Sequence, residues 1–429
     1  MENVLVLGMK TSGNSASALL KSRGIKVKCY DDNINFDGNW KNKKDKALDG
    51  IDGICISPGI PNNHELIVEA KNKGIEIFSE LELGVNALNS KIVMITGTNG
   101  KTTTVDMVER GLLLAGKSAK AMGNIGYPVS QVALDKTNSE YAIVEASSFQ
   151  LEYVKNIRVD IAVVLNLAPD HIDRYSGYIE YINAKKRIFI NQTQDDYAIL
   201  NYDLKQTREL ANSTRAKPIF VSTNSIIGDF YITQGAIYFK KEKLVNIKEC
   251  RVKGEHNRFN MLVALNIMKL LGCGPQHFLT LIREYKTLPH RVEYISTINQ
   301  KRFYNDSKGT NIAACIVAIN SLSSSKIGLI MGGSDKKEDF CEFFDELSPD
   351  VKYVIATGSN DVKIYGHAMK VGFQNIEIKP NLESAVKRLY ELKEIDTILF
   401  SPASASFDRY ASYHERGEKF KEIVYGLKA

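Results

Sequence analysis

The segment MITGTNGKTTTVDM, residues 94 to 107, most constrains how this chain of 429 residues can fold. It continues the apolar run KIVMIT and leads into Val105, Val108 and Leu112, which recur at helical spacing. This order predicts a strand, a loop and a helix. Glycines in such a loop let backbone N–H groups approach an anion, and the helix N-terminus attracts negative charge. The segment therefore predicts a phosphate-binding loop.

The loop differs from the common nucleotide-binding sequence, because Ile95 stands where a glycine usually lies six residues before the lysine. Lys101 can neutralise the β- and γ-phosphates of a nucleotide, and Thr102 can offer its hydroxyl to Mg²⁺. A glycine-rich turn without a ligand is the alternative, and the flanking elements argue against it. The residues expected to contact the nucleotide here are Gly97, Thr98, Asn99, Gly100, Lys101, Thr102 and Thr103.

The composition is that of an ordinary globular protein, with 44% hydrophobic and 25% charged residues. The formal charge of +6 is modest, and no basic stripe with aromatic residues appears, so we expect no nucleic-acid partner. Six scattered cysteines without a CxxC pair suit a reducing compartment. Neither a signal peptide nor an apolar run of about 18 residues is present, which predicts a cytoplasmic protein that does not bind membranes.

Apolar runs alternate with helical patterns along the whole chain, which predicts an α/β protein with parallel sheets. The first unit contains NVLVL, IKVKCY and GICIS. The second begins with KIVMIT and continues through YAIVEAS, DIAVVLNLA and YAILN, and we expect the alternating stretch FYITQGAIYF to extend its sheet. The segment LPHRVEY marks the start of a third unit. We therefore predict domains over residues 1–89, 90–287 and 288–429.

Polar residues follow several strands, where they would face a ligand at the carboxyl edge of a sheet. In the first unit, Thr11 and Ser12 would lie near a phosphate and Asp31 near a ribose or base, although a plain strand-to-helix turn explains this loop nearly as well. In the second unit, Glu145 and His171 each follow an apolar strand. A lone histidine there is more often structural. Its placement with a carboxylate and a phosphate loop favours a Mg²⁺ site.

The third unit carries polar strand ends of the same kind, in PHR, YNDSKGTN, GGSDKKEDF and SPASASFDRYASYHERG. Their side chains could bind phosphate, ribose and carboxylate groups, and those we select are Arg291, Asp306, Lys308, Lys336 and Ser406. Lys336 or Lys337 could face the site, and the spacing from the glycines favours Lys336. Lys185 lies in the predicted helix of YINAKKRIF, where an unmodified lysine would normally be a surface cation.

Together these segments resemble the Mur ligase family, the ATP-dependent amide-forming enzymes of peptidoglycan precursor synthesis. The resemblance spans essentially the whole chain and depends on the order and spacing of GTNGKTTT, GNIG, VEASSFQLE, NLAPDHID and AKKRIF. SPGIP, SELELG, LPHR, YNDSKGTN and SPASASFDRY are most similar to the member that adds D-glutamate to UDP-N-acetylmuramoyl-L-alanine. The resemblance implies an N-terminal Rossmann-like domain for UDP, a central P-loop mononucleotide-binding domain and a C-terminal Rossmann-like domain for the amino acid.

The resemblance also implies a reaction. The γ-phosphate of ATP passes to the carboxylate of the L-alanyl substrate, and the amine of D-glutamate attacks the resulting acyl phosphate. Lys101 and two magnesium ions would screen these like charges. By match to the family, Thr102 and Glu145 would ligate one ion, and His171 with Lys185 would serve the other. Lys185 matches a carbamylated lysine of the family, which is an anionic oxygen donor. The implied catalytic residues are Lys101, Glu145, His171 and Lys185.

The remaining ligands follow from the same match. Asn124 and Ser147 would contact the muramoyl-alanine part. The residues implied around ATP are Asn257, Asn260, Arg291 and Asp306. Those implied around D-glutamate are Lys308, Thr310, Lys336, Ser406 and Tyr413. Two positions depart from the family pattern: Asn33 stands where an arginine is sometimes found, which leaves the uracil contacts open, and Tyr413 replaces a familiar phenylalanine.

Two alternatives remain on sequence grounds. The first is a related amide ligase that adds another amino acid or extends folate with glutamate. An N-terminal unit of about 90 residues argues against the folate enzyme, and the lack of a DNPR-like segment argues against a diamino-acid ligase. The second is a nucleotide-dependent switch that hydrolyses ATP slowly. We expect a monomer whose domains close around the substrates.

Overall fold

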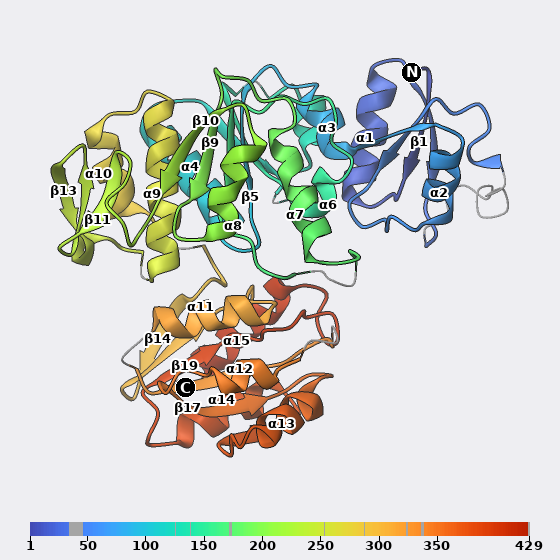
Figure 1. Ribbon diagram of the computed structural model, residues 1–429. Helices are drawn as coiled ribbons and strands as arrows, with labels where there is room; N and C mark the ends of the chain where they lie inside the picture. Colours follow the sequence, from blue (N-terminus) through green and yellow to red (C-terminus); the bar gives the residue numbers. More distant parts are fainter. Residues whose placement is uncertain are drawn as a thin grey trace. The chain divides into compact units, whose positions relative to one another are not determined.

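The computed structural model describes residues 1–33, 46–124, 126–137, 139–170, 174–252, 254–286, 288–322, 325–335 and 339–427 (Figure 1). The described residues form two compact units. The first comprises Met1–Arg251 with Asn257–Tyr285, and the second comprises Val252–His256 with Lys286–Ala429. Largely parallel sheets flanked by helices build both units, which confirms the predicted α/β class. The domain boundaries near residues 89 and 287 stay predictions.

The amino-terminal sheet of the first unit is parallel throughout, with strand order β2-β1-β3-β4. Its helices bury apolar residues at helical spacing, such as Ala16, Leu19 and Leu20 of α1. The strands are β1 Asn3–Leu7, β2 Lys26–Tyr30, β3 Gly53–Ile56 and β4 Glu76–Ser79. The helices are α1 Thr11–Ser22, α2 Glu65–Asn72 and α3 Glu80–Val85.

A larger parallel sheet follows in the same unit, with strand order β10-β9-β8-β5-β7-β6. Its strands are β5 Lys91–Thr96, β6 Ala119–Gly123, β7 Tyr141–Glu145, β8 Ile161–Val164, β9 Tyr197–Asn201 and β10 Lys217–Val221. The α-helices are α4 Lys101–Leu114, α5 Val129–Leu134, α6 Ser148–Leu151, α7 Tyr178–Lys186, α8 Lys205–Glu209, α9 Glu255–Leu270 and α10 Pro275–Glu284, and the 3₁₀-helices are η2 Arg187–Phe189 and η3 Leu210–Ser213. Strand β5 lies between β7 and β8, so the segments that follow these three strands meet at one carboxyl edge.

The prediction for FYITQGAIYF is wrong, because this stretch does not extend the sheet of β5. It forms β11 (Phe230–Thr233) and β12 (Ala236–Phe239) of a separate antiparallel sheet with β13 (Glu242–Asn246), which the 3₁₀-helix η4 (Ile247–Glu249) follows. Gln234 and Gly235 have left-handed backbones, with φ of 47° and 69°, so a two-residue turn reverses the chain. Phe230 and Phe239 then pack on Phe278 of α10, with ring centroids 5.1 and 5.4 Å apart.

The second unit contains a mixed sheet of order β14-β15-β19-β16-β17-β18, in which β14 is antiparallel to β15 and the other described pairs are parallel. The strands are β14 Glu293–Ile298, β15 Lys301–Asn305, β16 Ile327–Met331, β17 Val351–Ala356, β18 Ile376–Ile378 and β19 Thr397–Phe400. The helices are α11 Ile312–Ser321, α12 Cys341–Asp345, α13 Asp361–Lys370, α14 Leu382–Glu391 and α15 Tyr413–Gly426. Strand β19 lies between β15 and β16, which brings their carboxyl ends to one edge.

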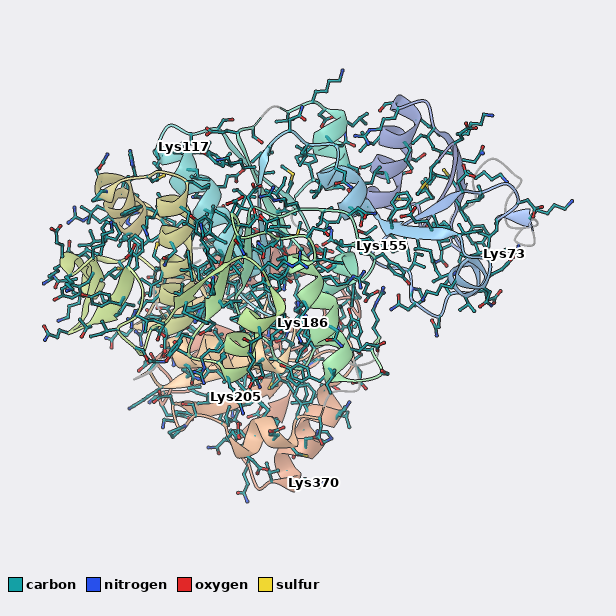
Figure 2. The ribbon with its side chains drawn as sticks, turned by 45° about the horizontal axis from the view of Figure 1, so that its top comes forward. Lys73, Lys117, Lys155, Lys186, Lys205 and Lys370 are labelled. Atoms are coloured by element: carbon teal, nitrogen blue, oxygen red, sulfur yellow. The ribbon has the colours of Figure 1, made fainter. Side chains whose placement is uncertain are left out.

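Solvated lysines are distributed over several surface elements (Figure 2). Lys73 follows α2, Lys205 begins α8 and Lys370 ends α13, and all three side chains are exposed.

Among the helices that the structure describes, none has an apolar stretch long enough to cross a bilayer.

Candidate active site

The candidate phosphate loop joins the central strand β5 to α4. Gly100 caps the helix in a left-handed conformation with φ of 87°, and Gly97 has φ of 151°. A Cβ atom on Gly100 would lie 2.8 Å from Oδ1 of Asn260 on α9, so a larger residue would require the loop or the Asn260 side chain to move. The first turn of α4 consists of Lys101, Thr102 and Thr103. Its backbone N–H groups begin where the loop ends, an arrangement that binds anions.

Asn166 holds this loop in place, and sequence reasoning did not select it. Its Oδ1 accepts the backbone N–H groups of Thr98 and Asn99 at 3.1 and 2.9 Å, and its Nδ2 donates to the carbonyl of Asn99 at 3.0 Å. The residue follows β8 in NLAPDHID, so its position as a polar strand end was the signal that could have identified it. Its amide therefore fixes the backbone of a loop that the predicted ligand would contact.

Two lysines from distant parts of the sequence meet at the loop. The Nζ of Lys101 donates to the carbonyls of Gly97 and Thr98 at 2.8 Å each, and the Nζ of Lys185 donates to the same Gly97 carbonyl at 2.9 Å. Lys185 is 2% exposed, and its Nζ lies 4.7 Å from the ring centroid of Tyr181. Burial, followed by the charge of Lys101, holds the pKa of Lys185 well below its ordinary value. A neutral amine is therefore favoured at this position.

Glu145 ends β7 beside the loop and is 2% exposed. Its Oε1 accepts a hydrogen bond from Nδ2 of Asn124 at 2.8 Å, whereas its Oε2 is buried without a hydrogen-bond partner among the described residues. A buried carboxylate oxygen in this state favours a nearby cation. Ser147 caps α6: its Oγ accepts the N–H of Gln150 at 3.3 Å, and Oε1 of Gln150 accepts the N–H of Ser147 at 3.0 Å. The predicted substrate residues Asn124 and Ser147 thus flank Glu145.

The residues predicted to bind UDP lie at the carboxyl edge of the amino-terminal sheet. Asp31 follows β2 and is buried, and its two carboxylate oxygens accept the N–H groups of Met9 at 2.7 Å and Asn33 at 2.9 Å. The first bond fixes the loop before α1, in which Thr11 and Ser12 form the first turn. Asp31 therefore shapes the loop by hydrogen bonds within the protein, and its predicted contact with a ribose or base stays a prediction.

In the second unit, Asp306 follows β15, and its Oδ2 accepts the hydroxyl of Ser401, which follows β19, at 2.6 Å. Burial raises the pKa of Asp306 to about 7. The Nζ of Lys308 lies 3.8 Å from the ring centroid of Tyr413, the first residue of α15. Ser406, seven residues before α15 in the sequence, is buried. Thr310 and Arg291 are half-buried.

Arg416 organises this edge of the second unit, although the sequence offered no signal that distinguished it from other charged residues near the chain end. The residue is 3% exposed, and its guanidinium donates to the carbonyls of Ser307, Ser404 and Ala405 at 2.8, 3.0 and 3.0 Å. It therefore joins the loop after β15, which carries Lys308, to the loop after β19. Burial lowers the pKa of Arg416 to about 10.

The remaining predicted residues lie in different units or outside the described residues. His171 and Lys336 lie outside the described residues. Asn257 and Asn260 belong to the first unit, whereas Arg291 and Asp306 belong to the second. The predicted ATP ligands are therefore divided between two units, and the roles assigned to them stay predictions.

Comparison with known proteins identifies the family. The model of the Mur ligase middle domain matches residues 95–268, and that of the Mur ligase, glutamate ligase domain, matches residues 290–404. A UDP-N-acetylmuramoylalanine–D-glutamate ligase of Thermoanaerobacter pseudethanolicus is 35% identical and covers 100% of this chain and 99% of its own. The chain belongs to the Mur ligase family. A ligase of the same name from Aquifex aeolicus is 36% identical to this Mur ligase over 98% of both chains.

Solved structures show the same fold. The UDP-N-acetylmuramate-alanine ligase MurC of Thermotoga maritima has a TM-score of 0.62 at 16% identity and covers 100% of both chains. The MurF ligase of Thermotoga maritima in complex with ADP has a TM-score of 0.60 at 19% identity, with 90% of this chain and 92% of that chain covered. This likeness confirms the predicted α/β fold.

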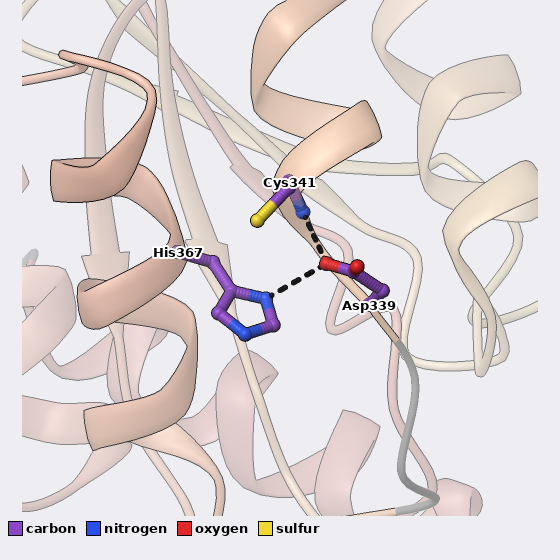
Figure 3. Close-up of side chains that lie close together, drawn as sticks. All are labelled: Asp339, Cys341 and His367. Atoms are coloured by element: carbon purple, nitrogen blue, oxygen red, sulfur yellow. Dashed lines mark hydrogen bonds and ion pairs between the residues drawn. The ribbon is translucent and has the colours of Figure 1, made fainter.

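Another cluster of potential metal ligands lies in the second unit, where Asp339, Cys341 and His367 place their ligand atoms within 4.8 Å of one another (Figure 3). The contacts explain this arrangement without an ion. Oδ1 of Asp339 accepts the N–H of Cys341 at 2.8 Å, and Nδ1 of His367 accepts the N–H of Phe340 at 3.0 Å. Both acceptors satisfy backbone donors at the start of α12. We therefore assign the cluster to capping this helix.

Proposed function

We propose that this Mur ligase uses ATP to add D-glutamate to UDP-N-acetylmuramoyl-L-alanine in cytoplasmic peptidoglycan precursor synthesis. Relatives aligned over the full chain carry the name of that ligase, which supports this amino acid over another. The observation that carries the chemistry is the meeting of Lys101, Lys185 and Glu145 around one phosphate loop. In this proposal residues 1–89 bind the UDP substrate, residues 90–287 bind ATP and residues 288–429 bind D-glutamate, within a monomer.

Phosphoryl transfer depends on the loop after β5. The N–H groups at the start of α4 would hold the phosphates, and the Lys101 ammonium would leave the loop carbonyls to neutralise charge on the transferred group. The phosphoryl group leaves ADP as a bond forms to a carboxylate oxygen of the L-alanyl substrate. This step brings two anions together, so positive charge must be fixed in advance. The hydrogen bonds from the loop to Asn166 hold its N–H groups in position before the substrates bind.

The residues at the loop fit Mg²⁺. The buried Oε2 of Glu145 lacks a protein partner, and Thr102 in the first turn of α4 adds a hydroxyl. Mg²⁺ takes oxygen ligands of this kind, and when bound it would screen the phosphate charges and hold their oxygens in line. His171 and Lys185 would serve a second ion in the same proposal.

Lys185 fits that role best as a carbamate, because an ammonium would repel both Lys101 and a metal ion, and Mg²⁺ takes oxygen ligands in preference to an amine nitrogen. Its depressed pKa favours a neutral amine, which is the form that attacks carbon dioxide. The nitrogen forms a bond to the carbon of carbon dioxide and loses a proton, so that the product carries a negative charge on oxygen. We propose this modification for Lys185.

The second half-reaction uses the second unit. Lys308, Thr310, Lys336, Ser406 and Tyr413 would hold the two carboxylates of D-glutamate, so that its amine attacks the acyl carbon and phosphate leaves. Lys308 and Tyr413 are already adjacent, and Arg416 orders the loops around them. Closure of the domains would bring this amine to the acyl phosphate.

The test is an amino-acid panel. ADP release should require both UDP-N-acetylmuramoyl-L-alanine and D-glutamate. If L-lysine, diaminopimelate or L-glutamate supports faster turnover than D-glutamate, the proposed substrate is wrong. ATP hydrolysis that needs neither substrate would instead support a nucleotide-dependent switch.

A further inference from the structure

We propose that Arg174 is a positioning residue that aligns the bound UDP substrate with the phosphate-transfer site, an inference that rests on the proposed function. It stands after β8, three residues beyond His171 in the sequence. Arg174 is not among the site residues predicted from the sequence. Its contacts connect the edge of the amino-terminal sheet with the turn that follows Glu145.

The first contact is a largely buried ion pair. The side chains of Arg174 and Glu152 are 10% and 7% exposed. Nε and Nη2 of Arg174 donate to the two carboxylate oxygens of Glu152 at 3.0 and 2.8 Å, so the pair is bidentate. Glu152 caps the C-terminus of α6, whose N-terminus is capped by the predicted substrate residue Ser147. The pair therefore sets the position of this short helix.

The same guanidinium reaches the amino-terminal sheet. Its Nη1 donates to the carbonyl of Pro58 at 3.2 Å, in the loop after β3. The neighbouring Ser57 donates its hydroxyl to the carbonyl of Gly8 at 2.6 Å, which ties this loop to the one before α1. Open α/β sheets bind ligands at this carboxyl edge. Arg174 therefore contacts the edge where we place UDP.

The planar geometry of arginine is needed for these contacts. The guanidinium carbon of Arg174 lies 4.2 Å from the ring centroid of Phe149 on α6, so the side chain is stacked as well as hydrogen-bonded. Lysine carries the same charge but has neither the bidentate fork nor the flat face. A lysine should therefore fail to restore the alignment.

Other contacts hold the two sheets together without Arg174. Tyr153 donates its hydroxyl to Oδ1 of Asn62 at 2.7 Å, and Glu82 accepts the N–H groups of Lys155 and Asn156 at 2.5 and 3.2 Å. Loss of the arginine should therefore shift the substrate rather than separate the sheets. A misplacement of about 1 Å is enough to change rates by about 100-fold.

The experiment compares steady-state kinetics and melting of the full chain with Arg174→Gln and Arg174→Lys. We expect the KM for UDP-N-acetylmuramoyl-L-alanine to rise about 10- to 100-fold and kcat to fall, with unchanged KM for ATP and D-glutamate. Phe149→Leu removes only the stacking and should shift the same KM less. The matched control is Arg158→Gln, because Arg158 forms a comparable bidentate pair with Asp196 at 3.0 and 3.1 Å, and its KM values should not change.

Several results would overturn the inference. Wild-type kinetics in both Arg174 variants would do so, and so would wild-type kinetics in Arg174→Lys alone. An equal rise of the KM values for all three substrates, together with a lower Tm, would mark a merely structural residue. Failure of the wild type to use D-glutamate would reject the proposed function alone. In that case calorimetry of UDP-N-acetylmuramoyl-L-alanine binding decides the inference, which requires weaker binding by Arg174→Gln than by Arg158→Gln. Equal binding, or no binding to the wild type, rejects it.

Discussion

Replacement of Gly100 by alanine tests whether the phosphate loop works through its close approach to α9. Gly100 has φ of 87°, and an added Cβ would lie 2.8 Å from Oδ1 of Asn260. An L-residue in the left-handed region costs roughly 1–2 kcal/mol. An unstrained contact needs a separation of roughly 3.5 Å, so the loop or the asparagine must also move by roughly 0.7 Å.

These two effects have different consequences. The backbone cost alone should lower the Tm by no more than roughly 8 °C for a unit of this size. Movement of the loop should misplace its N–H groups, and we expect at least about tenfold weaker ADP binding, equivalent to about 1.4 kcal/mol.

A matched control separates them. Gly116 follows the opposite end of α4 with φ of 72°, and no atom lies within 4 Å of its added Cβ. Gly116→Ala should therefore lower the Tm by a similar amount and leave ADP binding unchanged. Melting curves and calorimetric ADP titrations of both variants provide the measurement. Equal ADP affinity in the two variants would refute the argument that the contact with Asn260 sets the loop.

Four further predictions concern the site and the fold. Lys185→Met should lower turnover on the order of 100-fold, and a wild-type enzyme freed of carbon dioxide should recover activity on addition of bicarbonate if Lys185 acts as a carbamate. Chelation with EDTA should abolish ADP release and excess Mg²⁺ should restore it; persistent turnover would exclude the proposed ions. Burial raises the pKa of Asp306 to about 7. This carboxyl therefore stabilises the folded state below about pH 4, and its contribution is lost as the pH rises through 7. Asp306→Asn should make the free energy of unfolding, measured by urea titration, less dependent on pH over this range. Phe278→Ala removes the ring that packs edge-on against the stacked Phe230 and Phe239. It should destabilise the first unit by about 3–5 kcal/mol, and a smaller loss would mean that β11 and β12 do not depend on α10.

Much of the fold was predictable because its signals are local. Short apolar runs bounded by turns identified the parallel strands, and helical spacing identified α4. The alternating run from Phe230 to Phe239 was correctly assigned to strands but to the wrong sheet. Periodicity reports that one face is buried, but it does not say whether a helix or another strand covers that face. The two-residue turn at Gln234 and Gly235 decided the outcome.

The candidate site divides in the same way. Some site positions can be recognised from their immediate neighbours in the sequence, so the sequence predicted where they lie. They are the glycines and lysine of the phosphate loop, Glu145 and the polar strand ends of the second unit. Asn166 and Arg416 were missed because their function lies in the backbone groups that they bind, and those groups come from distant segments. Asn166 stands at a polar strand end, which the sequence does show, whereas no local pattern distinguishes Arg416 from other charged residues.

The sequence by itself determined the α/β alternation, the position of the phosphate loop and, through the order of its motifs, the family. Tertiary structure decided that Lys185, which sequence composition would place on the surface, is buried against the same carbonyl as Lys101. It also decided that Arg174 joins the turn after Glu145 to the edge of the amino-terminal sheet. The physical reason is that local patterns specify elements, whereas desolvation and shared hydrogen-bond acceptors depend on which elements pack together.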